Sequence, residues 1–446
     1  MDVTSYLKVF TFLLCLVPSV SWAQESVQHD LRSCLEEGLL KNLDLQISRN
    51  LEEKARNNAT WANAGALPSV DASAGYRAGL TNLDRSVNRT TGEVTSNAGY
   101  ADQTIDAGVS LGWTLFDGFK VQTTHRQLNV LRQQGEVATR MAVEDLMADI
   151  ASEYYNYLQQ IIRLNNYDYA MKLSRERLRI ASVNYQTGRF SGLDFHQAEV
   201  DFHSDSSAYV RQLEAVTRSN IQLNKLMGET YVDRRIELPH LDIQVREDLN
   251  FDDLWSNTLR ANASLLYADH ASQIAELDFK KILSRNYPYL KLNAAYSYTH
   301  YHYGINQTRL RDNLGLNGGL TVGINLWDGN RRRERRNAQL DIENKKLARQ
   351  QLELELKANL TTFWESYRNN LNLLELQRKN LLIAQDNMEI AMDRYKLGDL
   401  SGFDMRQIEK NLLDAEERVL QVQYDAKICE ISLLLISGDI GAYLRL

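Results

Sequence analysis

The segment Tyr185-Gln-Thr-Gly188-Arg-Phe-Ser191-Gly192-Leu-Asp194-Phe-His-Gln197 occurs twice in this chain. It returns 210 residues later as Tyr395-Lys-Leu-Gly398-Asp-Leu-Ser401-Gly402-Phe-Asp404-Met-Arg-Gln407, with six identical residues. Each copy follows a long proline-free run and precedes a second helical pattern. Glycine at such positions favours a tight turn at the end of a helix. The repeat therefore predicts two helical hairpins that end in the same way.

Other matches show that the duplication extends over the whole mature chain. Gly228 matches Gly438 at the same offset, Gly112–Gly118 resembles Gly323–Gly329 at an offset of 211, and Asn42 and Pro68 match Asn262 and Pro288 at 220. The change in offset is due to a longer loop, at 81–102, in the first half. An ordered series of matches indicates repeated architecture. We expect a first structural repeat over 24–238 and a second over 239–446.

Each half contains two segments in which apolar and polar residues alternate. Strict alternation over about a dozen residues predicts a β-strand with one apolar face. Such strands are long enough to cross a bilayer, which takes about 9–11 tilted residues. Four strands cannot close a barrel, and open sheet edges do not survive in lipid, so several chains must share one barrel. The apolar positions run from Val70 to Leu80, from Ile105 to Leu115, from Leu290 to Tyr298, and from Leu314 to Leu326.

Long helices are predicted after the second strand of each half. The segments at about 119–185 and 330–395 contain no proline and almost no glycine, and each would be roughly 100 Å long. Asp117-Gly118 and Asp328-Gly329 precede them, and we expect these aspartates to cap exposed backbone N–H groups. Shorter helices are predicted at about 30–66, 192–228, 250–286 and 402–437. Two short helices placed end to end would be about as long as one long helix.

The N-terminus has the pattern of an export signal. An apolar run over 9–20 is followed by Ser21-Trp-Ala23, which predicts a signal peptide over 1–23. The net charge of −7 gives no reason to expect nucleic acid. The mature chain keeps Cys34 and Cys429, for which two small buried residues are a simpler interpretation than a disulfide. No catalytic constellation is present, so neither a cofactor nor a metal is implied.

In their order, the duplicated features resemble the TolC-like outer membrane efflux family. The resemblance rests on Pro68 and Pro288, the two Asp-Gly turns and the doubled tip segment, and it covers essentially the whole mature chain. It implies a mixed α and β membrane protein, a homotrimer whose twelve-stranded β-barrel takes four strands from each chain. The barrel continues into a long periplasmic α-helical barrel. Such a protein is the passive exit channel of a tripartite efflux or type I secretion system.

The resemblance also assigns roles at the tips. In this family the tips meet a periplasmic adaptor protein, which links the channel to an inner-membrane pump. That role falls on Gly188, Arg189, Phe190, Ser191, Gly192, Gly398, Asp399, Leu400, Ser401 and Gly402. Plain turn chemistry explains the glycines, but Phe190 and Leu400 are expected to be exposed.

A gate is implied at the same end of the chain. Asp404 matches a position where three aspartates surround the channel axis, and Asp194 and Tyr395 match a hydrogen-bonded pair that keeps the tip closed. Two departures stand out. The second aspartate position is Gln407, and a second polar link maps to Leu400 and Leu193.

Other interpretations stay open at this point. A trimeric coiled-coil structural or surface protein without a transport role would also satisfy the helical pattern. Arg331, Arg332, Arg333, Arg335 and Arg336 open a helix next to the membrane, where cations are unfavourable. Either phosphates of outer-membrane lipid or salt bridges to neighbouring helices would compensate. The cargo, whether drug, metal or protein, is not encoded in these features.

Overall fold

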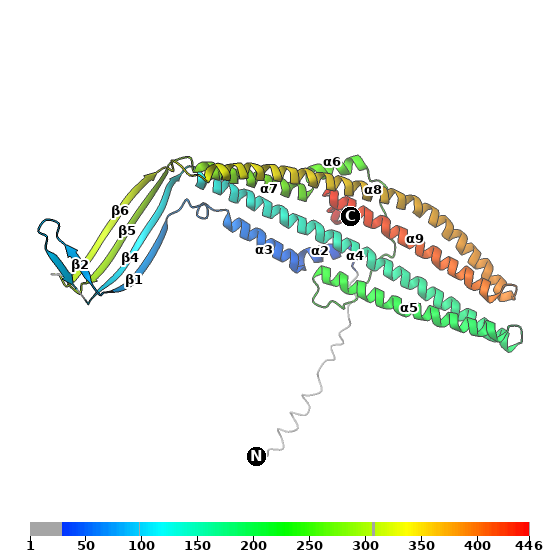
Figure 1. The fold of residues 1–446 in the computed structure, drawn as a ribbon. Coiled ribbons are helices and arrows are strands. Elements are labelled where there is room, and N and C mark those ends of the chain that lie inside the picture. The colour runs from blue at the N-terminus through cyan, green and yellow to red at the C-terminus, as the bar shows by residue number, and fades with distance from the viewer. Residues whose placement is uncertain (1–28, 98, 306–307, 446) are drawn as a thin grey trace, which may run out of the picture.

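The computed structural model describes residues 29–97, 99–305 and 308–445, so the predicted signal peptide lies outside the described residues. The molecule is elongated. A four-stranded sheet occupies one end, and long helices run from it to two hairpin tips at the other end (Figure 1). Among the described residues, no helix combines the length and the apolar character that crossing a membrane requires.

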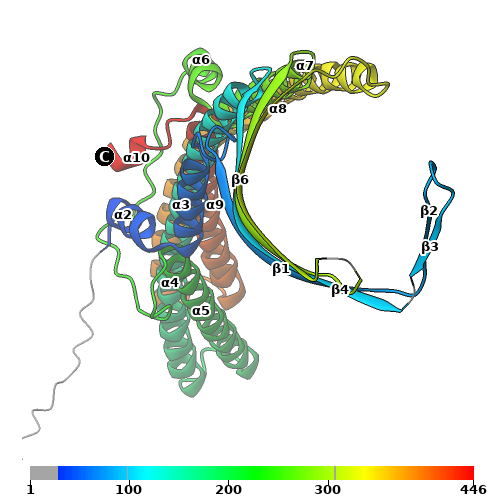
Figure 2. The same ribbon diagram turned by 90° about the vertical axis from the view of Figure 1, so that its left-hand side faces the viewer.

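The sheet consists of β1 (Ser69–Thr81), β4 (Tyr100–Asp117), β5 (Tyr289–His302) and β6 (Leu310–Gly323), all antiparallel in that spatial order. Its register brings apolar residues of neighbouring strands opposite one another, as in the pairs Val109–Tyr296 and Tyr296–Leu316. One continuous apolar face results, which confirms the alternation read from the sequence. The sheet bends into an arc, and β1 and β6 are its two edges (Figure 2).

Two details of the sheet differ from the predictions. The last strand ends at Gly323 and not at Leu326, because its partner β5 begins only at Tyr289, opposite Gly323. The long loop of the first half contains an additional hairpin, β2 (Asp84–Val87) with β3 (Val94–Asn97). Strands this short give too little alternation to be recognised in a sequence.

The two long helices are confirmed as α4 (Lys120–Gln186) and α8 (Arg331–Leu397), of 67 residues each. The predicted aspartates stand at their starts. The Asp117 carboxylate accepts a hydrogen bond from the Val121 N–H at 3.1 Å, and the Asp328 carboxylate accepts one from the Asn330 N–H at 2.9 Å. Both residues therefore accept hydrogen bonds from backbone N–H groups at the start of a long helix.

Two of the four shorter helices were predicted correctly, α5 (Gly192–Met227) and α9 (Gly402–Ser437). The other two predictions were wrong, because each is two helices in the structure. The first half has α2 (Leu31–Lys41) and α3 (Leu43–Asn58). The second half has α6 (Phe251–Ala261) and α7 (Ala263–Ser284), and a short α10 (Ala442–Arg445) ends the chain. The breaks fall at Asn42 and Asn262, whose side chains cap the following helix.

The short helices meet end to end at two glycines. Gly228 follows α5 with φ of 76°, and Gly438 follows α9 with φ of 73°. A Cβ atom at Gly228 would lie 2.7 Å from the Lys41 carbonyl carbon, and one at Gly438 would lie 2.9 Å from the Ala261 oxygen. Both sites need glycine for its conformation and for the close approach of another backbone. The main core surrounds this junction and includes Cys34, Leu35, Ile150 and Leu223.

Candidate functional site: the hairpin tips

The two hairpins α4/α5 and α8/α9 end side by side at the pole opposite the sheet (Figure 1). Gly188 and Gly398 take left-handed backbone conformations there, with φ of 75° and 80°. The N–H groups of the glycines donate to the carbonyls of Tyr185 and Tyr395, both at 3.0 Å. The doubled segment is thus a pair of equivalent helix terminations, as its glycines predict.

The Ser-Gly-x-Asp part of the segment is a helix cap. Ser191 and Asp194 form a complete capping box, in which the Ser191 hydroxyl accepts from the Asp194 N–H at 3.2 Å and the Asp194 carboxylate accepts from the Ser191 N–H at 3.0 Å. Ser401 repeats the first contact with the Asp404 N–H at 3.1 Å, and its hydroxyl donates to the Asp404 carboxylate at 2.7 Å. Both aspartates consequently have a structural role in starting α5 and α9.

The apolar side chains at the tips are distributed differently from the prediction. Phe190 and Leu400 are half-buried and pack into a small core around Tyr395, so the expectation that they are exposed was wrong. Much larger exposed fractions are found at Leu193, Leu397 and Phe403, with 77%, 82% and 77%. Leu193 and Phe403 occupy equivalent repeat positions directly after the Ser-Gly pair. The sequence repeat predicts that equivalence.

Asp194 and Tyr395 lie on one cavity of about 290 Å³ between the two hairpins. Within the described part of the chain their side chains share no hydrogen bond; the Asp194 carboxylate bonds with Ser191 instead. Tyr395 is 1% exposed, whereas its repeat equivalent Tyr185 is 49% exposed and stacks on Phe195. Burial raises the pKa of Tyr395; the Arg177 guanidinium opposes this rise, whereas the Asp194 and Asp201 carboxylates add to it.

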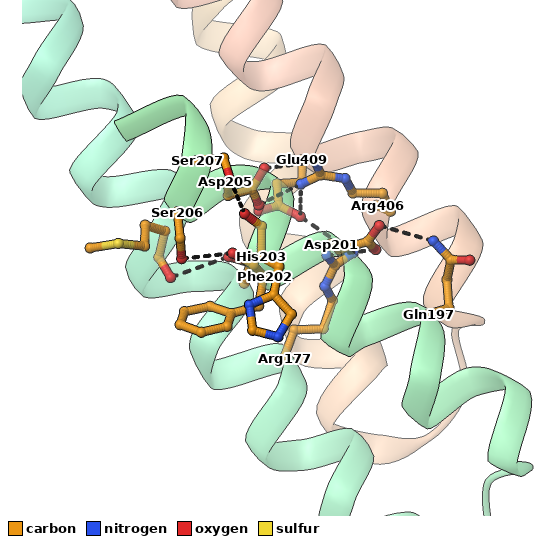
Figure 3. A network of polar contacts seen from close by, with 12 residues as sticks. Arg177, Gln197, Asp201, Phe202, His203, Asp205, Ser206, Ser207, Arg406 and Glu409 are labelled. Atoms are coloured by element: carbon orange, nitrogen blue, oxygen red, sulfur yellow. Dashed lines mark hydrogen bonds and ion pairs between the residues drawn. The ribbon is translucent and has the colours of Figure 1, made fainter. Parts of the chain in front are cut away.

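Directly beside this cavity, five charged side chains from three helices form one ionic cluster (Figure 3). Arg177 of α4 donates to Asp201 of α5 at 2.9 Å. Arg406 of α9 donates both terminal nitrogens to Asp205 of α5, at 2.8 and 2.7 Å. Glu409 of α9 lies 3.4 Å from Arg177 and 3.3 Å from Arg406. We call this cluster the hairpin clasp; its members lie too far apart along the chain for any local pattern in the sequence to predict it.

One face of α8 is buried within the chain and includes Leu360, Tyr367, Leu374 and Tyr395. A second apolar stripe on α8 remains exposed in the single chain. Its members recur mostly at intervals of seven: Leu340, Leu347, Leu354, Leu376, Ile383, Ile390 and Leu397. A heptad stripe of this kind is typical of a helix that packs against a further helix.

The arginine run at the start of α8 is only partly neutralised. Arg331 donates to the Asn286 side chain at 3.1 Å, and Glu334 pairs with Arg285 at 2.6 Å. The described residues provide no ion-pair partner for Arg332, Arg333, Arg335 or Arg336. Together with Leu326 and Trp327, three of these four arginines (Arg332, Arg335 and Arg336) line a surface hollow of about 640 Å³.

Cysteines and metal-binding side chains give no further site. Cys34 and Cys429 are both free and buried, in different apolar clusters. In 29–97, 99–305 and 308–445, no three histidine, cysteine or acidic side chains are placed to hold a metal ion.

Comparison with known proteins agrees with this geometry. Residues 34–229, which span most of the first repeat, match the family described as outer membrane efflux protein. The first half of the chain is thus similar to this family. Members of this family are outer membrane channels of efflux systems and not enzymes, with the sheet in the membrane and the helices on the periplasmic side. The family consists of trimeric channels.

Solved structures share the fold at low sequence identity. The chain is similar to the Campylobacter jejuni CmeC outer membrane channel, with 16% identity, 95% of this chain and 90% of that chain covered, and a TM-score of 0.73. It is also similar to the outer membrane protein VceC of Vibrio cholerae, with 16% identity, 92% of this chain and 96% of that chain covered, and a TM-score of 0.71. A membrane protein from Pseudomonas aeruginosa is similar at 16% identity, with 93% of this chain and 92% of that chain covered and a TM-score of 0.74. Curated protein sequences contain no significant match.

Proposed function

We propose that three copies of this chain form the exit channel of a tripartite system, with a twelve-stranded barrel in the outer membrane and a helical tunnel below it. In this proposal a periplasmic adaptor and an inner-membrane pump deliver substrate to the hairpin tips. The channel itself is passive and needs neither a cofactor nor a metal. The mature protein consists of the two repeats 24–238 and 239–446, and residues 1–23 are the export signal.

The observation that carries the proposal is the open, four-stranded sheet. Its apolar face is continuous across all four strands, while β1 and β6 each lack a partner on one side among the described residues. Unpaired strand edges are not tolerated in lipid, so β6 of one chain has to pair with β1 of the next. The exposed heptad stripe of α8 supports the same assembly. In a ring of three chains it would face α3 and α5 of the neighbour, which expose Leu43, Ile47, Leu51, Leu193 and Val200.

For the adaptor, we propose the two tip turns as the docking surface, namely Gly188 to Gly192 and Gly398 to Gly402. The exposed apolar neighbour Phe403 adds contact area that Phe190 and Leu400 do not provide. Exposed apolar groups rimmed by polar residues are typical of protein interaction sites.

For the gate, we propose a ring of three Asp404 carboxylates on the channel axis, supported by Asp194 and Tyr395. Asp404 lies exposed in the first turn of α9, and its capping bond to Ser401 fixes the direction of the side chain. A ring of carboxylates would favour cations and narrow the tip.

At the membrane surface, we propose that phosphates of outer-membrane lipid compensate Arg332, Arg335 and Arg336. These side chains line a hollow with the exposed apolar residues Leu326 and Trp327, just below the end of β6. Polybasic side chains at a bilayer surface attract anionic headgroups.

Single-channel conductance in planar bilayers tests this function. We expect discrete pores of low conductance from the purified wild-type trimer, and an Asp404→Ala variant with higher conductance and weaker cation preference. An Asp414→Ala variant, further along α9, serves as the control. If Asp404→Ala leaves the conductance unchanged, the constriction lies at other residues. A folded trimer that forms no pores would refute the channel function.

A further inference from the structure

The cavity between the two hairpins combines charged and apolar lining residues. Asp194, Asp201 and Arg177 are its charged members, and Tyr395 and Ala198 are buried residues of its apolar part. The remaining lining residues are Leu193, Gln197, Gly402 and Phe403. Its volume of about 290 Å³ lies near the lower end of the range for ligand pockets. Charged and apolar groups around one small cavity favour an amphipathic ligand.

The charged lining of the cavity has an excess of negative charge. Two carboxylates and one guanidinium group line it. That guanidinium is already neutralised, because Arg177 donates to Asp201 at 2.9 Å and lies 3.4 Å from the carboxylate of Glu409. Among the described residues Asp194 has no ion-pair partner. Both hydrogen bonds of its carboxylate, from the N–H and the hydroxyl of Ser191 at 3.0 and 2.7 Å, end at Oδ2. A hollow of one charge sign attracts the opposite charge, so the ligand that fits this cavity carries a cation.

Two further lining residues narrow the class of ligand. Tyr395 is only 1% exposed, and an aromatic ring attracts an ammonium group most strongly where water is excluded. Arg177 is 2% exposed, and its Nε has no hydrogen-bond partner in the described part of the chain. A buried donor without an acceptor is unfavourable. A cation that also carries a hydrogen-bond acceptor would therefore complement both Asp194 and Arg177.

We propose that this cavity is a binding site for a small amphipathic amine. The ammonium group of the ligand pairs with the Asp194 carboxylate, and its apolar body lies against Tyr395. A carbonyl or hydroxyl oxygen beside the ammonium group accepts from Arg177. The site goes beyond the proposed function, since binding at this cavity does not require that the protein forms pores.

Isothermal titration calorimetry of the detergent-solubilised protein with phenylalaninamide tests the site. This probe combines an ammonium group, a carbonyl acceptor and a benzyl group. N-Acetylphenylalaninamide keeps the acceptor and the ring but lacks the charge, so it should bind at least about tenfold more weakly. Phenethylamine keeps the charge and the ring but lacks the carbonyl, so it should bind about threefold to tenfold more weakly. Equal binding of the charged and uncharged amides, or no saturable binding of phenylalaninamide, would overturn the proposal.

Variants of the lining residues assign the binding to this cavity. Asp194→Asn removes the charge but keeps a side chain that can cap α5, and it should weaken phenylalaninamide binding about tenfold. Tyr395→Leu should weaken it about fivefold, whereas Tyr395→Phe keeps the ring and should bind like the wild type. Glu176→Gln is the control, as Glu176 pairs with the exposed Arg179 on its own helix and does not line the cavity.

Asp404→Asn distinguishes this cavity from the aspartates at the tip. Asp404 is the repeat equivalent of Asp194, caps α9 in the same way and does not line the cavity. Its change should leave the affinity for phenylalaninamide unaltered. An affinity that falls in Asp404→Asn but not in folded Asp194→Asn would place the amine at the tip and overturn the proposal. Saturable, Asp194-dependent binding to a trimer without pores would keep the site and refute only the channel function.

Discussion

Asn42 and Asn262, 220 residues apart, make the same set of contacts in the two halves of the chain. The side-chain oxygen of each caps the following helix by accepting from a backbone N–H, that of Leu45 at 3.0 Å and that of Leu265 at 3.1 Å. The side-chain nitrogen of each donates to a carbonyl near the end of another helix, Leu226 or Ile436, at 2.9 Å in both cases. In both halves an asparagine thus separates two consecutive helices and also forms a hydrogen bond to a third helix.

Replacing either asparagine with alanine should destabilise the protein by about 2–3 kcal/mol, since a cap and a partly buried hydrogen bond are lost together. Asn250→Ala is the control. Asn250 caps α6 through Asp252, without a bond to another helix, so its loss should cost only about 1 kcal/mol. Thermal unfolding of the detergent-solubilised protein measures the difference. Equal effects of Asn262→Ala and Asn250→Ala would show that the second bond adds nothing.

The glycines at the same junction make a second prediction. Gly228→Ala should be severely destabilising, because its Cβ would lie 2.7 Å from the Lys41 backbone at a φ of 76°. Gly188→Ala has the same left-handed conformation, with φ of 75°, but open space around it. It should therefore show only the conformational penalty of about 1 kcal/mol. The unfolding temperatures of the two variants test this prediction. Similar temperatures would mean that the backbone at Lys41 can shift to accommodate the added Cβ atom at little cost.

The repeat pattern was sufficient to predict the four long strands, the two long helices and the tip turns, because each depends on local patterning. The helix breaks at Asn42 and Asn262 were missed even though their equivalence was recognised. Asparagine is common both inside helices and at caps, and the residues on both sides continue the helical pattern. The structure adds what the sequence lacks, the carbonyls of Leu226 and Ile436 that hold each asparagine in place.

The same distinction applies to the tips. Ser191 and Asp194 are three residues apart, and this spacing identifies a cap from sequence alone. Arg406 and Asp205 are 201 residues apart, and no spacing rule connects them. The half-burial of Phe190 likewise depends on the other hairpin, which supplies Tyr395 and its neighbours.

The two cysteines should stay reduced and unreactive in the folded protein. Burial raises the pKa of Cys34 to about 12, and burial also raises the pKa of Cys429. At pH 8 almost no Cys34 thiolate forms, and only the thiolate is reactive. We expect no change in gel mobility on reduction, negligible alkylation of Cys34 in the native state and full alkylation after unfolding. Rapid labelling of the native protein at Cys34 would indicate frequent opening of the core around α2.

Glu409 gives the clasp a pH dependence whose sign follows from its surroundings. Burial raises the pKa of Glu409, and Asp205 of α5 adds to this, while Arg177 of α4 and Arg406 of its own helix oppose it. A carboxyl group with a raised folded-state pKa binds its proton more tightly in the folded protein. Its contribution to stability is fully present below the unfolded value of 4.5 and is lost as the pH rises through the folded-state value.

Glu409→Gln should therefore stabilise the protein at pH 7.5, by about 1 kcal/mol, because it removes the surplus buried charge. The gain over the wild type should shrink as the pH falls toward 4.5. Glu375→Gln is the control, since Glu375 is exposed on α8 and pairs with Lys379, so it should change little. Denaturant unfolding of both variants between pH 4.5 and 7.5 measures the effect. A Glu409→Gln protein that is less stable at pH 7.5 would show that the two arginines need the third carboxylate, and that the clasp carries no surplus charge.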